Sequence, residues 1–148
     1  MNILFVIDTI SFADHVAIAC LSAVAKQRGH NTFLCILSES DLKTIVMKIK
    51  PDIVAYSVNV VGFENIVLNH KKAISSYKFI SILGGPQATF CPESFNESGV
   101  DAYCIGEGEE AFDEFINCVE QGKPFDNVLN LITNKNKNPV RCLTDLNK

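Results

Sequence analysis

The sequence predicts an α/β protein with a doubly wound, flavodoxin-like sheet of five parallel strands. Five short runs are apolar throughout, which is typical of strands buried on both faces. Each run is followed by a segment with helical periodicity, and chains that alternate in this way form parallel sheets with helices on both faces. The usual order for five such strands is 2-1-3-4-5. The expected strands are residues 2–7, 32–37, 52–58, 78–83 and 100–105.

The helices are expected between these strands. Residues 16–28 read as a mostly buried helix that ends at Gly29. Residues 42–49 place apolar side chains at positions i, i+3, i+4 and i+7 of one helix face, and Pro51 ends that helix. The remaining helical segments are a long one at 63–77, a single turn at 92–95 with proline at its first position, and a last helix at 109–120.

The alternation of strands and helices stops after residue 122. We therefore divide the chain into a domain at residues 1–122 and a tail or linker at residues 123–148. Within the tail, residues 129–133 resemble a short strand, 134–139 a polar turn and 140–143 the returning strand of a hairpin.

Composition indicates one compact domain and excludes two classes of partner. With 148 residues, of which 47% are apolar and 20% charged, the chain can bury a substantial core. Its formal charge of -4 leaves no basic surface for nucleic acid. The first apolar run ends at Asp8, too early for a signal peptide or a membrane span. We expect a cytoplasmic protein that binds neither nucleic acid nor membranes.

The six cysteines show no metal-binding spacing. Cys35 and Cys104 fall in expected strands, and Cys20 and Cys118 in expected helices, where a reduced thiol packs as a small apolar group. Cys91 lies in an expected loop near the ligand edge and is the one cysteine considered for a functional role.

A ligand site is predicted at the carboxyl edge of the sheet, where open α/β sheets bind their ligands. Gly84 and Gly85 directly follow an apolar strand and leave its backbone bare at that edge. The alternative is that this Gly-Gly-Pro turn only ends the strand sharply. The predicted lining is Thr9, Ile10, Ser11, Phe12, Ser57, Val58, Asn59, Val60, Gly84, Gly85, Pro86, Gln87, Ala88, Thr89, Gly106, Glu107 and Gly108.

These loops favour binding over catalysis, because no Ser-His-Asp or Cys-His arrangement can be assembled from them. Ser57 and Thr89 offer hydroxyl groups, and Glu107 lies between two glycines where it can accept a hydrogen bond from a ligand. Glu109 and Glu110 have a structural explanation, since carboxylates complement the positive end of a helix.

Three segments of the chain resemble the cobalamin-binding domain at the amino end of B12-dependent radical SAM enzymes. They are residues 51–58, the Gly-Gly-Pro-Gln-Ala-Thr turn at 84–89, and residues 99–110 with their Gly-Glu-Gly-Glu-Glu turn; residues 21–24 and 28–30 are similar to the first helix of that family. The resemblance covers nearly the whole chain, and the combination of the two glycine turns makes it specific.

The resemblance implies that cobalamin lies across the carboxyl edge of the sheet. Its nucleotide tail would run into a crevice between strands, past the bare backbone of Gly84 and Gly85. Ser57 would lie beside the tail, and Gly106 and Glu107 would close the far wall.

The chain departs from the classical corrinoid domains at the cobalt ligand. Those domains carry Asp-x-His-x-x-Gly after the first strand, whereas this chain has Asp14-His15-Val16-Ala17-Ile18, with different spacing and no glycine. No metal ligand is therefore assigned, and His15 is the remaining candidate, although a loop histidine is more often solvated. His30 and His70 are interpreted as structural.

The chain also lacks the Cys-x-x-x-Cys-x-x-Cys triplet of a radical SAM domain. S-adenosylmethionine and a 4Fe-4S cluster are therefore expected only in a longer enzyme, for which residues 143–147 resemble the linker to a carboxyl-terminal radical SAM domain. A stand-alone corrinoid carrier or sensor is the alternative within the same family.

Two other classes fit less well. For an FMN electron carrier of flavodoxin type, Asp14 would repel the phosphate and the chain has no tryptophan to stack on a flavin. A phosphoacceptor signalling domain needs an aspartate at the end of the third strand, and residues 57–59 supply none.

Overall fold

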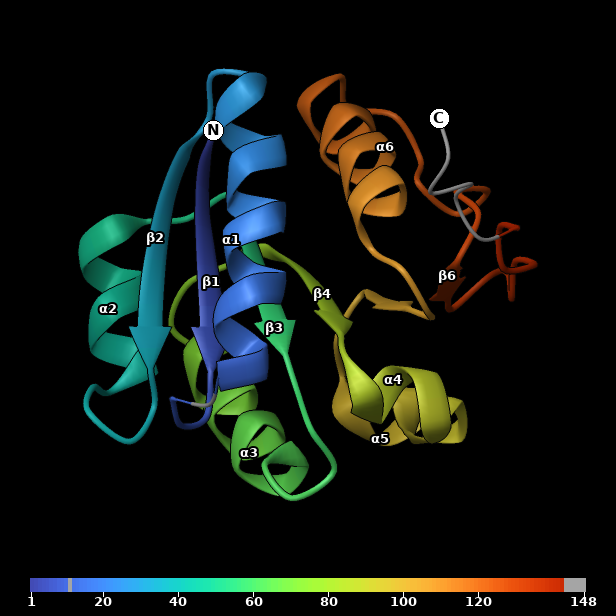
Figure 1. The fold of residues 1–148 in the computed structure, drawn as a ribbon. Helices are drawn as coiled ribbons and strands as arrows, with labels where there is room; N and C mark the ends of the chain where they lie inside the picture. The colour runs from blue at the N-terminus through green and yellow to red at the C-terminus, as the bar shows by residue number, and fades with distance from the viewer. Residues whose placement is uncertain (11, 143–148) are drawn as a thin grey trace.

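The computed structural model describes residues 1–10 and 12–142, with the backbone alone for residues 12–15. Its strands are β1 (Asn2–Ile7), β2 (Asn31–Ile36), β3 (Ile53–Ser57), β4 (Ile80–Gly84), β5 (Ala102–Cys104) and β6 (Leu131–Thr133). They form one sheet in the order β2-β1-β3-β4-β5-β6, in which the first five are parallel and β6 is antiparallel (Figure 1). The doubly wound fold with order 2-1-3-4-5 is confirmed, and β6 extends it by one strand.

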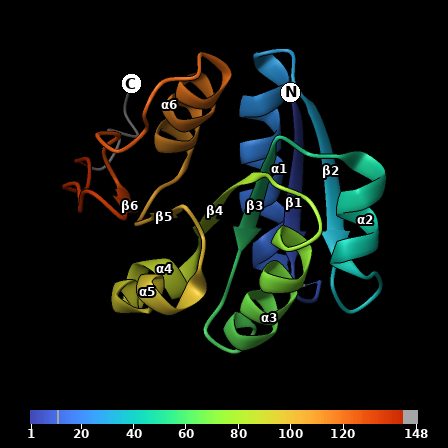
Figure 2. The same cartoon turned by 180° about the vertical axis from the view of Figure 1, so that it is seen from behind.

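Helices cover both faces of this sheet (Figure 2). They are α1 (Phe12–Gln27), α2 (Leu42–Ile49), α3 (Phe63–Ile74), α4 (Pro86–Phe90), α5 (Phe95–Ser98) and α6 (Glu109–Glu120), with a 3-10 turn, η1, at Pro92–Ser94. One face carries α1 and α6, and the opposite face carries α2 and α3, with α4 and α5 beside them. Within the described residues, no helix is long and apolar enough to cross a membrane.

The sheet separates two apolar cores because side chains alternate along each strand. On β1, Ile3 and Phe5 pack toward α1 and α6, whereas Leu4 and Val6 pack toward α2 and α3. All four are at most 1% exposed, as expected for a parallel sheet covered on both sides.

His70 belongs to the core beneath α3, which confirms its structural role. Its Nδ1 lies 2.9 Å from the Tyr56 hydroxyl and its Nε2 lies 3.1 Å from the carbonyl oxygen of Gly99. A carbonyl can only accept, so Nε2 carries the proton and the Tyr56 hydroxyl donates to Nδ1. Burial of this neutral ring lowers the pKa of His70.

The helices differ from the expected ones at several places. Helix α3 ends at Ile74 rather than at residue 77, and the single turn expected at 92–95 becomes η1 and α5, which extends to Ser98. Helix α1 begins at Phe12 rather than at residue 16, and residues 86–90, predicted to be an open loop, form α4. Pro86 occupies the first turn of α4, where its missing N–H costs nothing. The loop prediction for this segment was therefore wrong.

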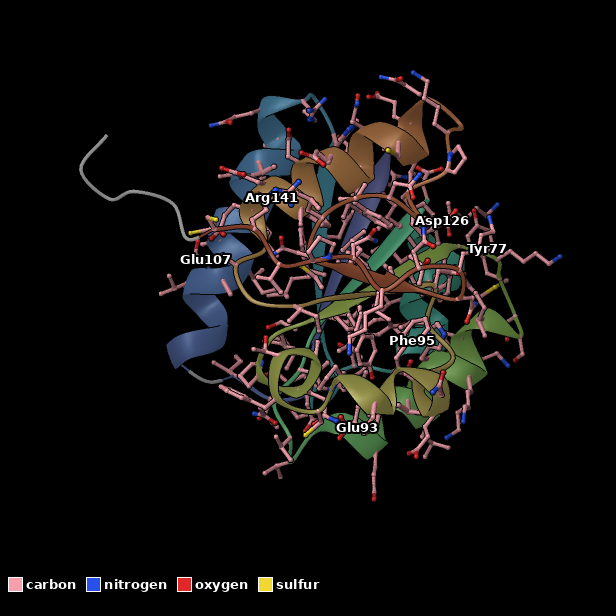
Figure 3. All side chains as sticks on the ribbon, turned by 90° about the vertical axis from the view of Figure 1, so that its right-hand side faces the viewer. Tyr77, Glu93, Phe95, Glu107, Asp126 and Arg141 are labelled. Atoms are coloured by element: carbon pink, nitrogen blue, oxygen red, sulfur yellow. The ribbon has the colours of Figure 1, made fainter. Side chains whose placement is uncertain are left out.

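The tail is part of the sheet, because β6 pairs with β5. A hairpin-like turn then brings Lys137 back opposite Ile132, earlier than the predicted return at 140–143. Asn138 fixes this return by donating from Nδ2 to the carbonyl oxygens of Asp126 and Leu131, at 2.8 and 2.9 Å. This side of the molecule faces the viewer in Figure 3, where Asp126 and Arg141 are labelled. The sheet thus extends past residue 122.

All six cysteines are free. Cys35 and Cys104 are buried as predicted, and Cys118 is half-buried. Cys20 is exposed on the outer side of α1, so the prediction that it packs inside was wrong.

Candidate functional site

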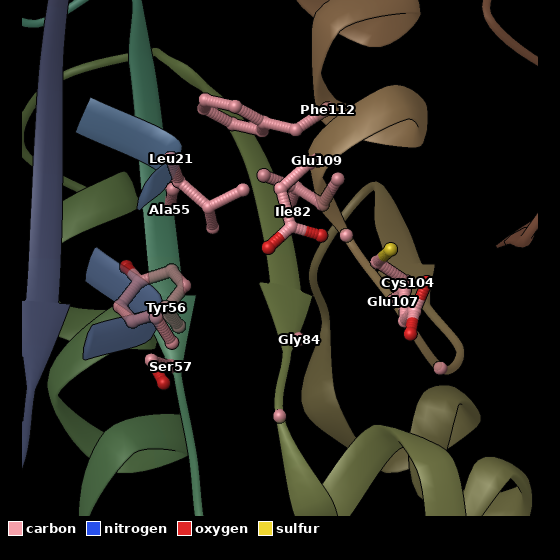
Figure 4. A pocket seen from close by; sticks show the side chains of 14 residues that line it. Leu21, Ala55, Tyr56, Ser57, Ile82, Gly84, Cys104, Glu107, Glu109 and Phe112 are labelled. Carbon is pink, nitrogen blue, oxygen red and sulfur yellow. The ribbon is translucent and has the colours of Figure 1, made fainter. Parts of the chain in front are cut away.

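A cavity opens at the carboxyl edge because the strands carry smaller side chains there. On the face that α1 and α6 cover, β3 changes from Ile53 to Ser57 and β4 changes from Ile80 to Gly84. Helices α1 and α6 do not move closer to the sheet where its side chains become small, so the space beside Ser57 and Gly84 stays unfilled. The result is a cavity of about 240 Å³ between the sheet, α1 and α6 (Figure 4).

The walls of the cavity come from five parts of the chain. Its floor is formed by β3, β4 and β5, one wall by α1, and the opposite wall by α6 and the loop before it. The lining residues are Ala17, Leu21, Ala55, Tyr56, Ser57, Ile82, Gly84, Gly85, Cys104, Gly106, Glu107, Gly108, Glu109 and Phe112.

Gly84 keeps the floor of the cavity open. A Cβ atom at this position would lie 3.8 Å from the Cβ atom of Cys104, which is an ordinary contact distance. The fold therefore tolerates a side chain at residue 84, and the absence of one leaves room for a ligand.

Gly85 has a different role, which is to allow the turn itself. Its φ of +94° favours glycine, and a Cβ atom would lie 2.9 Å from the carbonyl oxygen of Val58. The same carbonyl accepts a hydrogen bond from the backbone N–H of Gln87 at 3.0 Å. The interpretation of this glycine pair as a sharp strand exit thus applies to Gly85.

The loop at residues 106–108 forms the lip of the cavity and is held from both sides. The N–H of Gly106 donates to the Thr89 hydroxyl at 3.1 Å. The Asn130 amide donates to the carbonyl oxygens of Ile105 and Glu107 at 2.8 and 3.2 Å. Thr89 and Asn130 therefore position the lip.

Arg141 connects the tail to α6 behind this lip. Its Nη2 lies 2.7 Å from a carboxylate oxygen of Glu114 and its Nε lies 3.4 Å from one of Glu110. Its backbone N–H donates to the Asn130 side-chain oxygen at 3.0 Å. The two remaining acidic residues near the cavity, Glu107 and Glu109, form no ion pair within the described part of the chain.

The structure brings part of the predicted lining together. Ser57, Gly84, Gly85 and the loop at 106–108 line the cavity. The other predicted residues on the described chain lie outside it: Val58, Gln87 and Ala88 are buried, Thr9, Ile10, Asn59, Val60 and Pro86 are exposed, and Thr89 supports the lip. Ser11 and the side chains of Phe12 and His15 lie outside the described residues, so His15 stays a prediction.

Sequence reasoning missed the helical walls and the support of the lip. Leu21 and Phe112 have the inward periodicity of their helices, but that pattern does not distinguish a core residue from one that lines a cavity. Asn130 has a φ of +70°, and no local pattern announces its contacts with a loop more than twenty residues away.

The chemistry of the lining indicates binding. Burial raises the pKa of the Cys104 thiol to about 12, so this thiol stays protonated at neutral pH. The described residues contain no cluster of three metal-ligating side chains.

Fold and cavity together define an α/β domain with a cavity at the carboxyl edge of a doubly wound sheet. Residues 8–116 match the family model of the B12 binding domain, and the chain belongs to this family.

The chain is similar to one curated relative and to two solved structures. The chain is 32% identical over 104 residues to an uncharacterized methyltransferase, PH0819, of Pyrococcus horikoshii, and spans 22% of that protein. Its fold is similar to part of TsrM, a radical S-adenosylmethionine methyltransferase of Kitasatospora setae. The TM-score is 0.72 for a structure with cobalamin and a 4Fe-4S cluster bound, at 19% identity, covering 97% of this chain and 30% of TsrM. For a structure of TsrM with tryptophan and a SAM analogue bound, the TM-score is 0.70 at 20% identity, and the match covers 90% of this chain and 28% of TsrM.

Proposed function

We propose that this chain binds cobalamin at the carboxyl edge of its sheet, as the cofactor-binding module of a B12-dependent radical SAM enzyme. The observation that carries the proposal is the cavity between α1 and α6, open at Gly84, in a chain of the B12-binding family.

The cavity fits one part of cobalamin, which consists of a large corrin ring and a nucleotide tail that ends in a flat base. A volume of about 240 Å³ lies below the 300–1,000 Å³ that is usual for pockets that enclose a whole ligand. Only the base end of the tail would enter, and the corrin ring would lie outside on the edge of the sheet.

The edge around the cavity offers apolar surface for such a ring. Val61 is 93% exposed and Phe90 77%, and Ile10 and Val60 are also exposed. They follow β1, β3 and β4, so they share one edge of the sheet (Figure 1). A corrin ring on this edge would cover these apolar side chains.

The residues of the chain would bind and orient the cofactor. The Ser57 hydroxyl makes no hydrogen bond within the described part of the chain and can donate to the tail at the cavity mouth. Gly84 provides the space, and the lip at residues 106–108 closes one side. When bound, the corrin cobalt would supply methyl transfer or related radical chemistry.

The radical SAM context rests on the relatives and on the sequence. The chain spans 22% of the Pyrococcus horikoshii protein and about 30% of TsrM, and it lacks the cysteine triplet for the cluster. We infer that S-adenosylmethionine and the 4Fe-4S cluster would belong to a carboxyl-terminal radical SAM domain. The free cysteines support a cytoplasmic location.

Gly84→Leu tests the proposed site. The purified chain is mixed with cobalamin, passed through a desalting column and examined for the corrin absorption bands. We expect Gly84→Leu to lose binding, because its side chain fills the cavity. Gly84→Ala is the matched control and should fold with an unchanged circular dichroism spectrum, since its Cβ atom makes only an ordinary contact. Cobalamin retention by Gly84→Leu equal to that of the parent chain would show that the site is misplaced.

Mixing the purified chain with FMN tests the alternative function. A flavin spectrum after desalting would favour an FMN electron carrier over a cobalamin-binding module.

A further inference from the structure

We infer that the cavity selects among corrinoids by their nucleotide base and prefers one with an apolar far end, such as dimethylbenzimidazole, over a purine. This inference rests on the proposed function and adds the chemistry that decides which corrinoid is bound.

The inner end of the cavity is lined mainly by apolar side chains, with the carboxylate of Glu109 as the charged group beside them. Ala55 and Ile82 precede Ser57 and Gly84 by two residues, so they lie on the same face but further from the carboxyl edge. On the helical walls, Leu21 lies one turn beyond Ala17 and Phe112 nearly one turn beyond Glu109, in the same direction. In Figure 4, the side chains of Leu21, Ala55, Ile82 and Phe112 gather at the end of the cavity away from Ser57 and Gly84.

Apart from the carboxylate of Glu109, the polar groups of the lining do not serve this inner end. Tyr56 contributes no hydroxyl, because its hydroxyl points to the other face of the sheet and donates to His70 at 2.9 Å. Ser57 and Glu107 lie at the mouth, and the buried Cys104 thiol is a weak donor.

Dimethylbenzimidazole and adenine differ at the edge of the base that would reach the inner end of the cavity. The far edge of dimethylbenzimidazole carries two methyl groups, which an apolar wall accepts without loss. The far edge of adenine carries ring nitrogens, and a buried acceptor without a partner is costly. A carboxylate cannot satisfy a ring nitrogen, because both are acceptors.

Glu109 is the wall residue that could favour adenine instead, through the exocyclic amine. Its carboxylate points into the cavity between Leu21 and Ile82 in Figure 4. A single bond of this kind leaves the ring nitrogens unpaired, so we expect the apolar end to decide the preference.

The test compares three corrinoids on the purified chain by absorption titration. They are cobalamin, the analogue with adenine as its base, and cobinamide, which has no nucleotide. We expect cobalamin to bind tighter than the adenine analogue by about tenfold or more, since each unpaired buried group costs roughly 1.4 kcal/mol or more. Cobinamide should bind weakest, because it leaves the cavity unfilled.

Three variants, one of them a control, test where in the cavity the preference arises. Leu21→Gln places an amide at the inner end and should weaken cobalamin but not the adenine analogue, so that the ratio of the two affinities shrinks; a merely structural defect would weaken both equally. Leu68→Gln, on the exposed side of α3, is the matched control and should leave the ratio unchanged. Glu109→Gln should leave cobalamin preferred.

The possible failures can be told apart. If no corrinoid binds, the proposed function fails, and this inference fails with it. Equal affinities for cobalamin and the adenine analogue, or tighter binding of the latter, would overturn the inference and leave the proposed function standing. Cobinamide binding as tightly as cobalamin would show that the base lies outside the cavity, with the same consequence.

Discussion

At the scale of single residues, the neighbouring glycines Gly84 and Gly85 have different structural roles. Gly84 leaves a space that the fold does not require to be empty, whereas Gly85 adopts a backbone conformation that a side chain would strain. A bulky residue at position 85 would therefore damage the turn, since its Cβ atom would meet the backbone of Val58 at 2.9 Å. Substitutions at residue 84 are therefore the ones that test the proposed site.

His70 makes the stability of the protein sensitive to pH. Burial lowers its pKa in the folded state below the ordinary 6.5, so the unfolded chain takes up the proton first. Stability from this group is complete above pH 6.5 and is lost as the pH falls from there toward the folded pKa. Each pH unit that separates the folded pKa from the unfolded one corresponds to about 1.4 kcal/mol of unfolding free energy.

Urea unfolding at pH 7.5 and 5.5 checks this prediction. We expect the parent chain to be less stable at pH 5.5, and His70→Gln to show a smaller difference, because glutamine can bond Tyr56 and Gly99 without titrating. Some pH dependence should remain, since the pKa of His30 is also lowered by burial. An unchanged difference in His70→Gln would exclude His70 as a source.

At the scale of elements, the loop before α6 depends on the tail that follows α6. Asn130 is 2% exposed, and its side chain bonds the carbonyls of Ile105 and Glu107 and the N–H of Arg141. The strand β6 brings this residue back to β5. The lip of the cavity is thus fixed by residues that come later in the chain.

Asn130→Gly isolates this support. Glycine accepts the φ of +70° at this position, so the change removes the amide without straining the backbone. We expect a loss of about 1 kcal/mol in the free energy of unfolding, because two partly buried carbonyls lose their partner, together with weaker cobalamin binding. Urea unfolding and absorption titration measure the two effects. Asn134→Gly, at an exposed turn position, is the control, and equal effects of the two changes would contradict the prediction.

At the scale of the whole molecule, the sheet needs β6 to finish its edge. Leu131 is fully buried against the α6 side and Ile132 is 8% exposed on the other, so β6 contributes to both cores. Without it, the three-residue strand β5 would become an open edge, and such edges promote aggregation.

Truncation checks the role of β6. A chain of residues 1–122 should aggregate or melt at a lower temperature than the parent and than a chain of residues 1–142. Thermal unfolding followed by circular dichroism distinguishes the cases. A cooperative transition of residues 1–122 at the temperature of the parent would show that the edge strand adds no stability.

Much of the fold could be predicted because its signals are local. Apolar runs of strand length and helical periodicity indicated the parallel sheet, and the chain order then placed Ser57, Gly84 and residues 106–108 at one edge. The helix α4 was missed because the glycine pair was interpreted as the start of a loop, although Pro86 suits a first helical turn.

The sequence by itself determined the class of fold, the edge of the sheet that carries the cavity and the small residues that line it. These depend on the period of the side chains and on strand direction, which short segments encode. Only the tertiary structure decided that Leu21 and Phe112 wall the cavity, that Asn130 and Arg141 hold its lip, and that Gly85 serves the turn. The physical reason is that the volume and polarity of a cavity arise where side chains from separate layers meet, and those meetings have no local pattern.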